Sequence, residues 1–474
     1  MNGYLSTIND PGASRESRLE ALRAYEAGLR SPPSKAGSTG EINNHIHTIY
    51  SFSPYTPSMA ALKARDAGLE AAGSVDHDSI GAAREMTEAC AILGIGGCVG
   101  FELRVSFKSG PDGKRSPFAN RKINNPDSLG LAYMTVQGVP SPAIDKVGAF
   151  LAPIQARRND RTRRMTEAIN SILKPAGFRE LDFERDVLGI SKAAEGGGVT
   201  ERHLLSAMAS SLIEKHGKSS ALAASLEADL KVPVPAKIAT LLADPANPHY
   251  LFDLLGILKA GFLERVFIQP DGQECIPAKT VVDFARSIGA IPAYAYLGDV
   301  GESPTGDKKA EKFEDDYLDE LFAELIKIGY KAVAYMPPRN TVEQLKRVQK
   351  LCADKGLMEI SGVDINSSRQ SFNCPEVLKP EFRHLVGTTW ALIAHERLCS
   401  VDPALDLFSP ANPLAGLPLA ARIDAYAKAG RALDPGLSGQ ARLSGQAGLA
   451  GQAMQAAGSA ATVAEELRKG RYSR

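Results

Sequence analysis

Two hydrophobic periods alternate along most of the chain. Short runs rich in β-branched and aromatic residues are followed by stretches in which apolar residues recur every three or four positions. The short runs predict strands at 41–48, 71–78, 97–107, 265–270, 290–298, 331–337 and 357–366. The stretches between them predict helices at 58–70, 81–94, 278–289, 317–329 and 341–356. Strands that alternate with amphipathic helices indicate βα units and a parallel sheet or barrel.

Other segments interrupt or flank this rhythm. A helical pattern at 14–29 ends in a Pro/Gly/Ser linker, 107–145 is rich in Gly, Pro and Asn, and 146–246 is largely helical by pattern. A hexapeptide near-repeat at 437–454 is too short for a solenoid core and is typical of a low-complexity tail. We therefore expect an N-terminal helix and linker (1–40), a barrel (41–370) carrying a long loop and helical insertion (107–263), a C-terminal helical extension (371–435) and a tail (436–474).

Composition narrows the class of protein. The 474 residues suit a large barrel with additions, and 55 basic side chains balance 55 acidic ones, so net charge gives no signal for nucleic acid or an anionic membrane. Five arginines lie within 155–165, for which a solvated helix face is favoured over an anion-binding patch. Six cysteines without a CxxC pair, no secretory pattern and no run of eighteen apolar residues lead us to expect a cytoplasmic protein without a membrane span.

Candidate metal ligands follow the first three predicted strands. His45 and His47 are two residues apart and would share one face of a strand. The next strand ends in Asp76, His77 and Asp78, and the third carries Glu102. Because the carboxyl ends of parallel barrel strands meet at one mouth, these imidazoles and carboxylates are expected to converge there, where active sites are built.

These segments resemble the opening motifs of the PHP family, named for polymerase and histidinol phosphatase. "NNHIHTIYS" is similar to its HxH motif, "GLEAAGSVDHD" to its DH segment and "VGFEL" to its G-x-E strand. The resemblance covers residues 41–105 well and 264–370 loosely. It implies a TIM-like distorted (β/α)7 barrel of the α/β class, here with the helical insertion between the third and fourth strands. It also implies a metal-dependent phosphoesterase in which a metal-bound hydroxide attacks phosphorus.

Carried over position by position, the resemblance implies the metal ligands His45, His47, His77 and Glu102, and Asp364 in "SGVDINS". One or two divalent ions (zinc, manganese or iron) would be bound. Asp76 would support the site by orienting a histidine or accepting a proton, a role that Asp78 could share.

Four positions depart from the family pattern. Phe52, Gln137, Tyr296 and Asn366 stand where the family offers metal ligands. These side chains bind such metals poorly or not at all, so a trinuclear site is not expected. Three consequences remain open: a smaller site that is retained, with His203 as a possible replacement ligand; a catalytically silent binding protein; or altered chemistry with Tyr296 as a proton donor.

A retained site is favoured, because the segments at 296–309 and 364–376 are polar, charged and glycine-rich and follow predicted strands. Lys308, Lys309, Asn366 and above all Arg369 are candidates for binding a small anionic substrate, a phosphoester in the first instance. The enzyme alternative is a metal-dependent amidohydrolase on the same barrel.

Overall fold

A seven-stranded sheet forms the centre of the protein. The computed structural model describes residues 2–29, 38–301, 311–433 and 460–472. The strands follow one another in chain order across the sheet. They are β1 (Ile42–Ile46), β2 (Ala71–His77), β3 (Gly96–Ser106), β4 (Leu131–Gln137), β5 (Ile291–Ala295), β6 (Ala332–Tyr335) and β7 (Met358–Ser361).

The sheet curls until its first and last strands meet. Ile365, just after β7, forms a parallel bridge with Ile46. The His47 amide donates to the Ile365 carbonyl at 2.9 Å, and the Ile365 amide donates to the His45 carbonyl at 3.0 Å. Gly362 permits this approach, because a Cβ there would lie 2.5 Å from the His45 nitrogen. The predicted TIM-like barrel of the α/β class is therefore confirmed.

One strand differs from the prediction. β4 lies inside the segment expected to be a long loop, and it runs antiparallel to both β3 and β5. Residues 265–270 were predicted as the fourth strand. Arg265 instead ends a 3₁₀ turn (Leu263–Arg265), and residues 266–270 join no strand. Antiparallel neighbours need no crossover helix, so β4 lacks the βα context from which the other strands were inferred.

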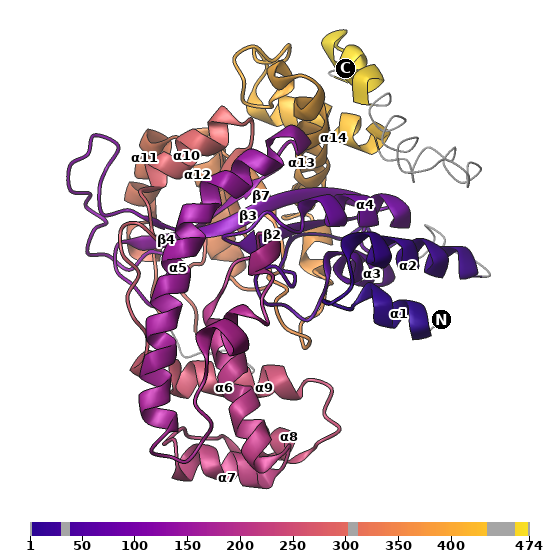
Figure 1. Ribbon diagram of the computed structural model, residues 1–474. Helices are drawn as coiled ribbons and strands as arrows, with labels where there is room; N and C mark the ends of the chain where they lie inside the picture. The colour runs from indigo at the N-terminus through magenta and orange to yellow at the C-terminus, as the bar shows by residue number, and fades with distance from the viewer. Residues whose placement is uncertain (1, 30–37, 302–310, 434–459, 473–474) are drawn as a thin grey trace.

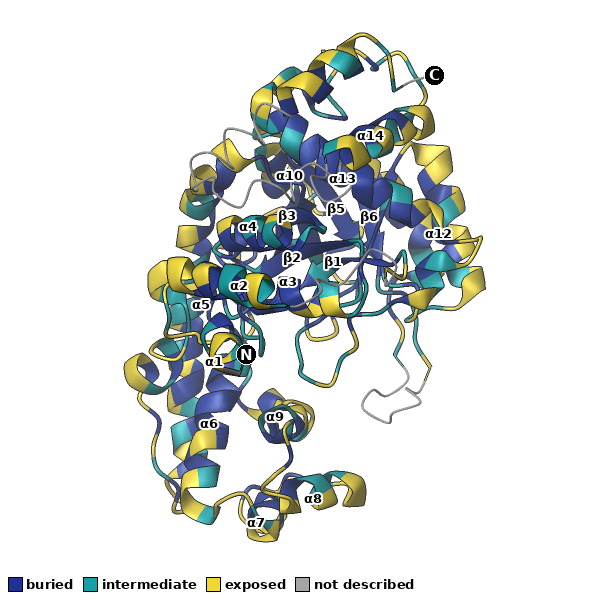
Figure 2. Ribbon diagram, turned by 90° about the vertical axis from the view of Figure 1, so that its right-hand side faces the viewer, coloured by how far each residue is buried: buried dark blue, intermediate teal, exposed yellow. Residues whose placement is uncertain are grey.

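Helices cover the barrel. Figure 2 shows that these helices are buried on the side toward the strands and exposed on the outer side. The buried side is apolar and belongs to the barrel core. Those around the sheet are α2 (Arg15–Gly28), α3 (Pro57–Asp66), α4 (Ala83–Leu93), α10 (Ala278–Ser287), α11 (Leu318–Ile328), α12 (Val342–Lys355) and α13 (His384–Val401). A short helix, α1 (Asn2–Ile8), precedes α2, and α14 (Leu419–Leu433) packs against α13. The sequence predicted no helix at 2–8.

A helical insertion lies between β4 and β5 and extends away from the barrel (Figure 1). It contains α5 (Ile144–Leu173), α6 (Glu201–His216), α7 (Ser220–Ala228), α8 (Ala236–Ala243) and α9 (Tyr250–Gly261). Its apolar side chains form a second core, separate from that of the barrel. α5 joins the two bodies, because Val147 and Leu151 are in the barrel core whereas Ile169 and Leu173 are in the second core.

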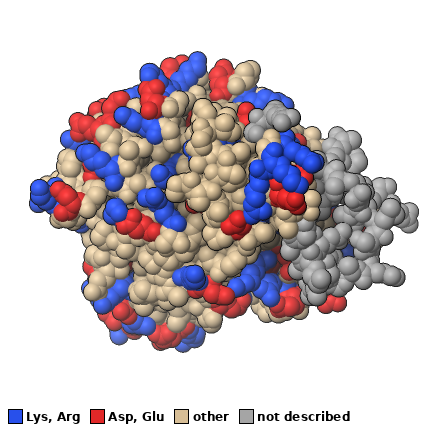
Figure 3. Space-filling view, turned by 90° about the horizontal axis from the view of Figure 1, so that it is seen from above, with Lys and Arg blue, Asp and Glu red and all other residues tan. Residues whose placement is uncertain are grey.

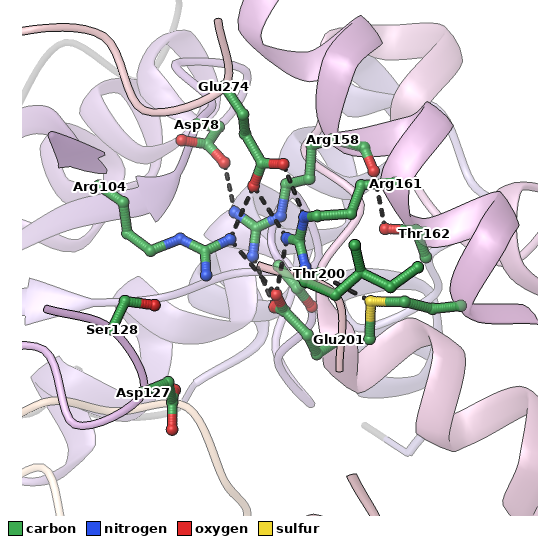
Figure 4. A network of polar contacts seen from close by, with 12 residues as sticks. Asp78, Arg104, Asp127, Ser128, Arg158, Arg161, Thr162, Thr200, Glu201 and Glu274 are labelled. Atoms are coloured by element: carbon green, nitrogen blue, oxygen red, sulfur yellow. Dashed lines mark hydrogen bonds and ion pairs between the residues drawn. The ribbon is translucent and has the colours of Figure 1, made fainter. Parts of the chain in front are cut away.

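Six charged side chains, mostly buried, tie the insertion to the barrel (Figure 4). Glu274 accepts from Arg104 of β3 at 2.8 Å and from Arg161 of α5 at 2.6 Å. Glu201 of α6 accepts from Arg161 at 2.8 Å and from Arg158 at 2.7 Å, and Arg158 also pairs with Asp78. Two of the five arginines at 155–165 are thus buried ion-pair partners rather than a solvated face. Three guanidinium groups balance three carboxylates, so the network carries no net charge.

The chain's end returns to the barrel. A helix covers residues 460–468, and its Ala464 and Leu467 are part of the barrel core. The hexapeptide near-repeat at 437–454 lies outside the described residues. Basic and acidic side chains are interspersed on the face seen from above in Figure 3. Within the described ranges, no helix is both long and apolar enough to cross a bilayer.

Candidate metal centre

Five predicted ligands meet at one end of the barrel. His45 and His47 come from β1 and its end, His77 ends β2, Glu102 lies on β3, and Asp364 follows β7. Glu102 Oε2 lies 3.6 Å from His45 Nε2, 3.5 Å from His47 Nε2 and 3.2 Å from His77 Nδ1. Asp364 Oδ1 is 3.4 Å from His47 Nε2. The structure thus brings three imidazoles and two carboxylates together.

These spacings suit a metal ion. Ligand atoms bound about 2.1 Å from one ion in tetrahedral geometry lie about 3.4 Å apart. Two overlapping triads have ligand atoms within 4.8 Å of one another: His45, His47 and Asp364 form one, and His47, His77 and Glu102 form the other. The two triads share His47, whose Nε2 can bind only one ion, so two separate ions could not each have all three ligands of their triad.

The hydrogen bonds of His47 define which of its ring nitrogens carries the proton. Ser51 Oγ donates to Asp76 Oδ1 at 2.6 Å, which uses its only hydrogen. At the 3.3 Å contact between Ser51 Oγ and His47 Nδ1, the serine must therefore accept, so the proton of a neutral His47 is on Nδ1. Nε2 then presents a lone pair. This atom is buried and has no hydrogen-bond partner among the described residues, as expected of a nitrogen that binds a metal ion.

Asp76 belongs to neither triad and instead accepts hydrogen bonds from the segment that follows His47. Its carboxylate accepts from the Thr48 amide at 2.6 Å and the Thr48 hydroxyl at 2.7 Å, as well as from Ser51. Burial raises the pKa of Asp76 to about 6, an increase that these hydrogen bonds oppose. Asp76 therefore positions the segment after His47.

Burial and neighbouring charge set the protonation of the imidazoles. Burial lowers the pKa of His47 to about 3 and holds the pKa of His77 well below its usual value. For His45, burial also lowers the pKa, but the carboxylates of Glu102 and Asp364 outweigh it and raise the pKa. His47 and His77 are thus neutral near pH 7, the form in which imidazole binds metal.

The Asp364 side of the cluster is joined to the insertion. Asn366 donates from Nδ2 to Asp364 Oδ1 at 2.6 Å, and its carbonyl accepts from Arg202 Nη1 at 2.7 Å. This hydrogen bond places the guanidinium of Arg202 next to the Asp364 loop, and its positive charge contributes to lowering the pKa of both His47 and His77. Asn366, expected to contact substrate, thus forms hydrogen bonds with a ligand and with Arg202.

Several other candidates have different partners. Tyr296 Oη donates to Asp315 Oδ1 at 2.6 Å. His203 Nδ1 accepts from the Thr200 amide at 3.0 Å, in a capping box at the start of α6, and belongs to neither triad. Arg369 forms two hydrogen bonds with Asp253 of α9. Lys308 and Lys309 lie outside the described residues.

The positions of Phe52 and Gln137 explain why these two residues depart from the PHP metal-ligand pattern. The Phe52 ring packs against His203 and Phe252 of the insertion rather than against the ligands. Gln137 pairs with Gly100 on β3, two residues before Glu102, because β4 is antiparallel. It therefore lies toward the opposite end of the barrel from the cluster. Thr135, not Gln137, faces Glu102 in register.

Sequence reasoning missed three side chains around the cluster. The Tyr133 ring on β4 lies 5.8 Å from the His77 ring. The charge of Arg202 affects two of the imidazoles, and Lys259 of α9 is near enough to Arg202 and Asp364 for their charges to alter its pKa, which burial lowers. Tyr133 was not identified because it lies on β4, which the sequence pattern did not predict. Arg202 and Lys259 belong to insertion helices whose orientation the sequence pattern did not reveal.

No protein-family model and no curated protein sequence matches the chain. Among solved structures, a proposed metal-dependent phosphoesterase from Bifidobacterium adolescentis is similar, with 18% sequence identity, a TM-score of 0.45, and coverage of 74% of this chain and 96% of that one. An amidohydrolase from Chromobacterium violaceum, with bound sulfate and no metal, has 16% identity, a TM-score of 0.45, and coverage of 73% and 95%.

Proposed function

We propose that the protein is a metal-dependent hydrolase that acts on a phosphoester. The proposal rests on the convergence of five side chains, in which His47 Nε2 is buried and has no hydrogen-bond partner within the part of the chain that the structure describes. The five are His45, His47, His77, Glu102 and Asp364. The donor set of nitrogen and carboxylate oxygen suits zinc, manganese or iron(II). When bound, such an ion supplies a Lewis acid and lowers the pKa of a coordinated water toward neutrality.

The chain's own residues would prepare this centre. Ser51 and Asp76 hold His47 in the tautomer that presents Nε2. Glu102 lies within 3.6 Å of all three imidazoles and supplies the negative charge that a divalent cation requires. Asn366 holds one carboxylate oxygen of Asp364 through its amide.

A phosphoester is favoured by the cations beside the cluster. Arg202 donates a hydrogen bond from Nη1 to the Asn366 carbonyl, and its guanidinium has further donors for the oxygens of a phosphoryl group. Lys259 of α9 is the second cation, and its charge interacts with those of Arg202 and Asp364. Arg202 and Lys259 are therefore proposed to bind the anionic substrate, a role that the sequence suggested for Arg369.

Metal analysis and a substrate panel test the proposal. Purified protein is expected to bind zinc or manganese, and His45→Ala combined with His47→Ala is expected to abolish both binding and activity. Phosphomonoesters and phosphodiesters are then compared with amides in the presence of added manganese or zinc. Hydrolysis of amides alone would show an amidohydrolase instead of a phosphoesterase. Absence of metal binding by the parent protein would overturn the proposal that it is a metal-dependent enzyme.

A further inference from the structure

The helical insertion holds the loops that carry two of the candidate ligands. On the His47 side, the Gly198 amide donates to the Tyr50 carbonyl at 2.8 Å and Thr200 Oγ1 donates to the Ser51 carbonyl at 3.4 Å. Gly198 must be glycine, because a Cβ there would lie 2.4 Å from the His77 carbonyl oxygen. The insertion therefore packs directly on the strand ends from which the ligands project.

On the Asp364 side, the contacts come mainly from α9 and the residue before it. His249 Nδ1 and Ser368 Oγ lie 2.8 Å apart, and Asp253 accepts two hydrogen bonds from the guanidinium of Arg369, that of Nη2 at 2.7 Å. Asp253 is 8% exposed and also accepts from Asn247, so its carboxylate is fixed within the insertion. A bidentate pair fixes orientation as well as distance.

The segment that follows the Ile365 bridge has little regular structure of its own. Residues 364–374 contain no helix or regular strand apart from the bridge at Ile365, and Asp364 lies five residues before Arg369. The Gln370 side chain accepts from the Asn366 and Ser367 amides at 2.7 Å, so Arg369 belongs to the same compact turn as the residue that holds Asp364.

We propose that Arg369 and Asp253 are positioning residues, which anchor the Asp364 loop to the insertion and thereby complete the metal centre. The inference rests on the proposed function insofar as the centre binds metal. The alternative is that Arg369 binds substrate directly, as its sequence context suggested. The two differ in what Asp253 does: a positioning pair needs both partners, whereas a substrate-binding arginine would be released by loss of Asp253.

The experiment is a double-mutant cycle with Arg369→Ala, Asp253→Asn and their combination, plus Arg369→Lys. Arg163→Ala serves as the control, because it breaks an exposed ion pair with Glu184 elsewhere on the insertion. Manganese and zinc affinities are measured for each variant. Hydrogen exchange of a peptide spanning 362–372 is followed in the metal-free full chain, and thermal melting in chelator reports folding.

Each single variant is expected to weaken metal affinity about tenfold or more and to speed exchange in that peptide. The double variant should be no worse than the single ones, Arg369→Lys should be intermediate, and the control should match the parent. An Arg369→Ala variant with unchanged exchange and metal affinity but a raised KM would overturn the proposal in favour of substrate binding.

The two proposals fail in different ways. If the parent protein binds no metal, the proposed function fails, while the exchange of the 362–372 peptide still decides whether Arg369 and Asp253 anchor the loop. Faster exchange in both single variants would support anchoring, and unchanged exchange would overturn it.

Discussion

The Phe52 ring lies edge-on to the His203 imidazole, with the ring centroids 5.0 Å apart and an interplanar angle of 84°. Phe52 has a positive φ of 74°, which is costly for a bulky residue and persists only where the surroundings hold it. His203 in turn caps the start of α6 through Thr200. Phe52 stands where the PHP pattern has a carboxylate, and here it forms part of the contact between barrel and insertion.

Phe52→Asp is expected to leave the number of bound metal ions unchanged, because the side chain of residue 52 lies toward His203 and Phe252. Loss of the half-buried ring should lower the free energy of unfolding by about 1–3 kcal/mol. Metal content by mass spectrometry and thermal melting check this. Phe52→Leu, which keeps an apolar side chain, is the matched control, and an extra ion bound by the aspartate variant would contradict the expectation.

The fold could be predicted because its strands alternate with amphipathic helices, and the α/β barrel is confirmed. β4 could not, since it lacks a crossover helix and lies in a Gly-, Pro- and Asn-rich segment. Strand-end reasoning named His45, His47, His77 and Glu102, which the structure brings together. It could not reveal that Arg369 pairs with Asp253, because Asp253 is 116 residues away in sequence and the placement of α9 depends on tertiary packing.

Ser51→Ala should weaken metal binding about tenfold or more, because His47 loses the acceptor that keeps its proton on Nδ1. Folding should be little affected, since Asp76 retains its two hydrogen bonds from Thr48. Isothermal titration with zinc or manganese measures the change. Ser53→Ala is the control in the same segment, since the Ser53 hydroxyl has no hydrogen-bond partner in the described structure. Equal affinities for the two variants would argue against the tautomer assignment.

Tyr296→Phe separates a catalytic from a structural tyrosine. The hydroxyl donates to Asp315, which also accepts from the Asp299 amide at 3.0 Å and from Gln344 at 2.6 Å. Removing it should lower the free energy of unfolding by about 1–2 kcal/mol while leaving kcat within a few-fold of the parent value. Denaturant unfolding and steady-state kinetics measure both quantities. A loss of kcat of a hundredfold or more would return Tyr296 to the role of proton donor.

Glu274→Gln should destabilise the protein by about 3 kcal/mol or more, because it leaves the buried guanidinium groups of Arg104 and Arg161 short of one negative charge. Glu184→Gln removes an exposed partner of Arg163 instead and should change stability by less than about 1 kcal/mol. Denaturant unfolding of both variants provides the comparison. Similar stabilities would mean that the network contributes little to holding the barrel and the insertion together.

Glu314 should make stability depend on pH. It is buried, and burial raises its pKa to about 7, whereas an unfolded glutamate titrates near about 4.3. Between these values the folded protein binds more protons than the unfolded chain, so the free energy of unfolding falls as pH rises. The stabilising contribution of Glu314 is complete below about pH 4.3 and is lost as pH rises through about 7.

Glu314→Gln should remove this slope. The amide keeps an oxygen to accept from the Leu297 backbone and the Tyr294 hydroxyl, which both donate to Glu314 Oε1, but it carries no titratable proton. The variant should match the parent near pH 5 and exceed its free energy of unfolding by roughly 2–3 kcal/mol at pH 8. Denaturant unfolding across this pH range measures the difference, with the exposed Glu343→Gln on α12 as control. If the difference between variant and parent stays constant from pH 5 to 8, Glu314 is not the group that titrates.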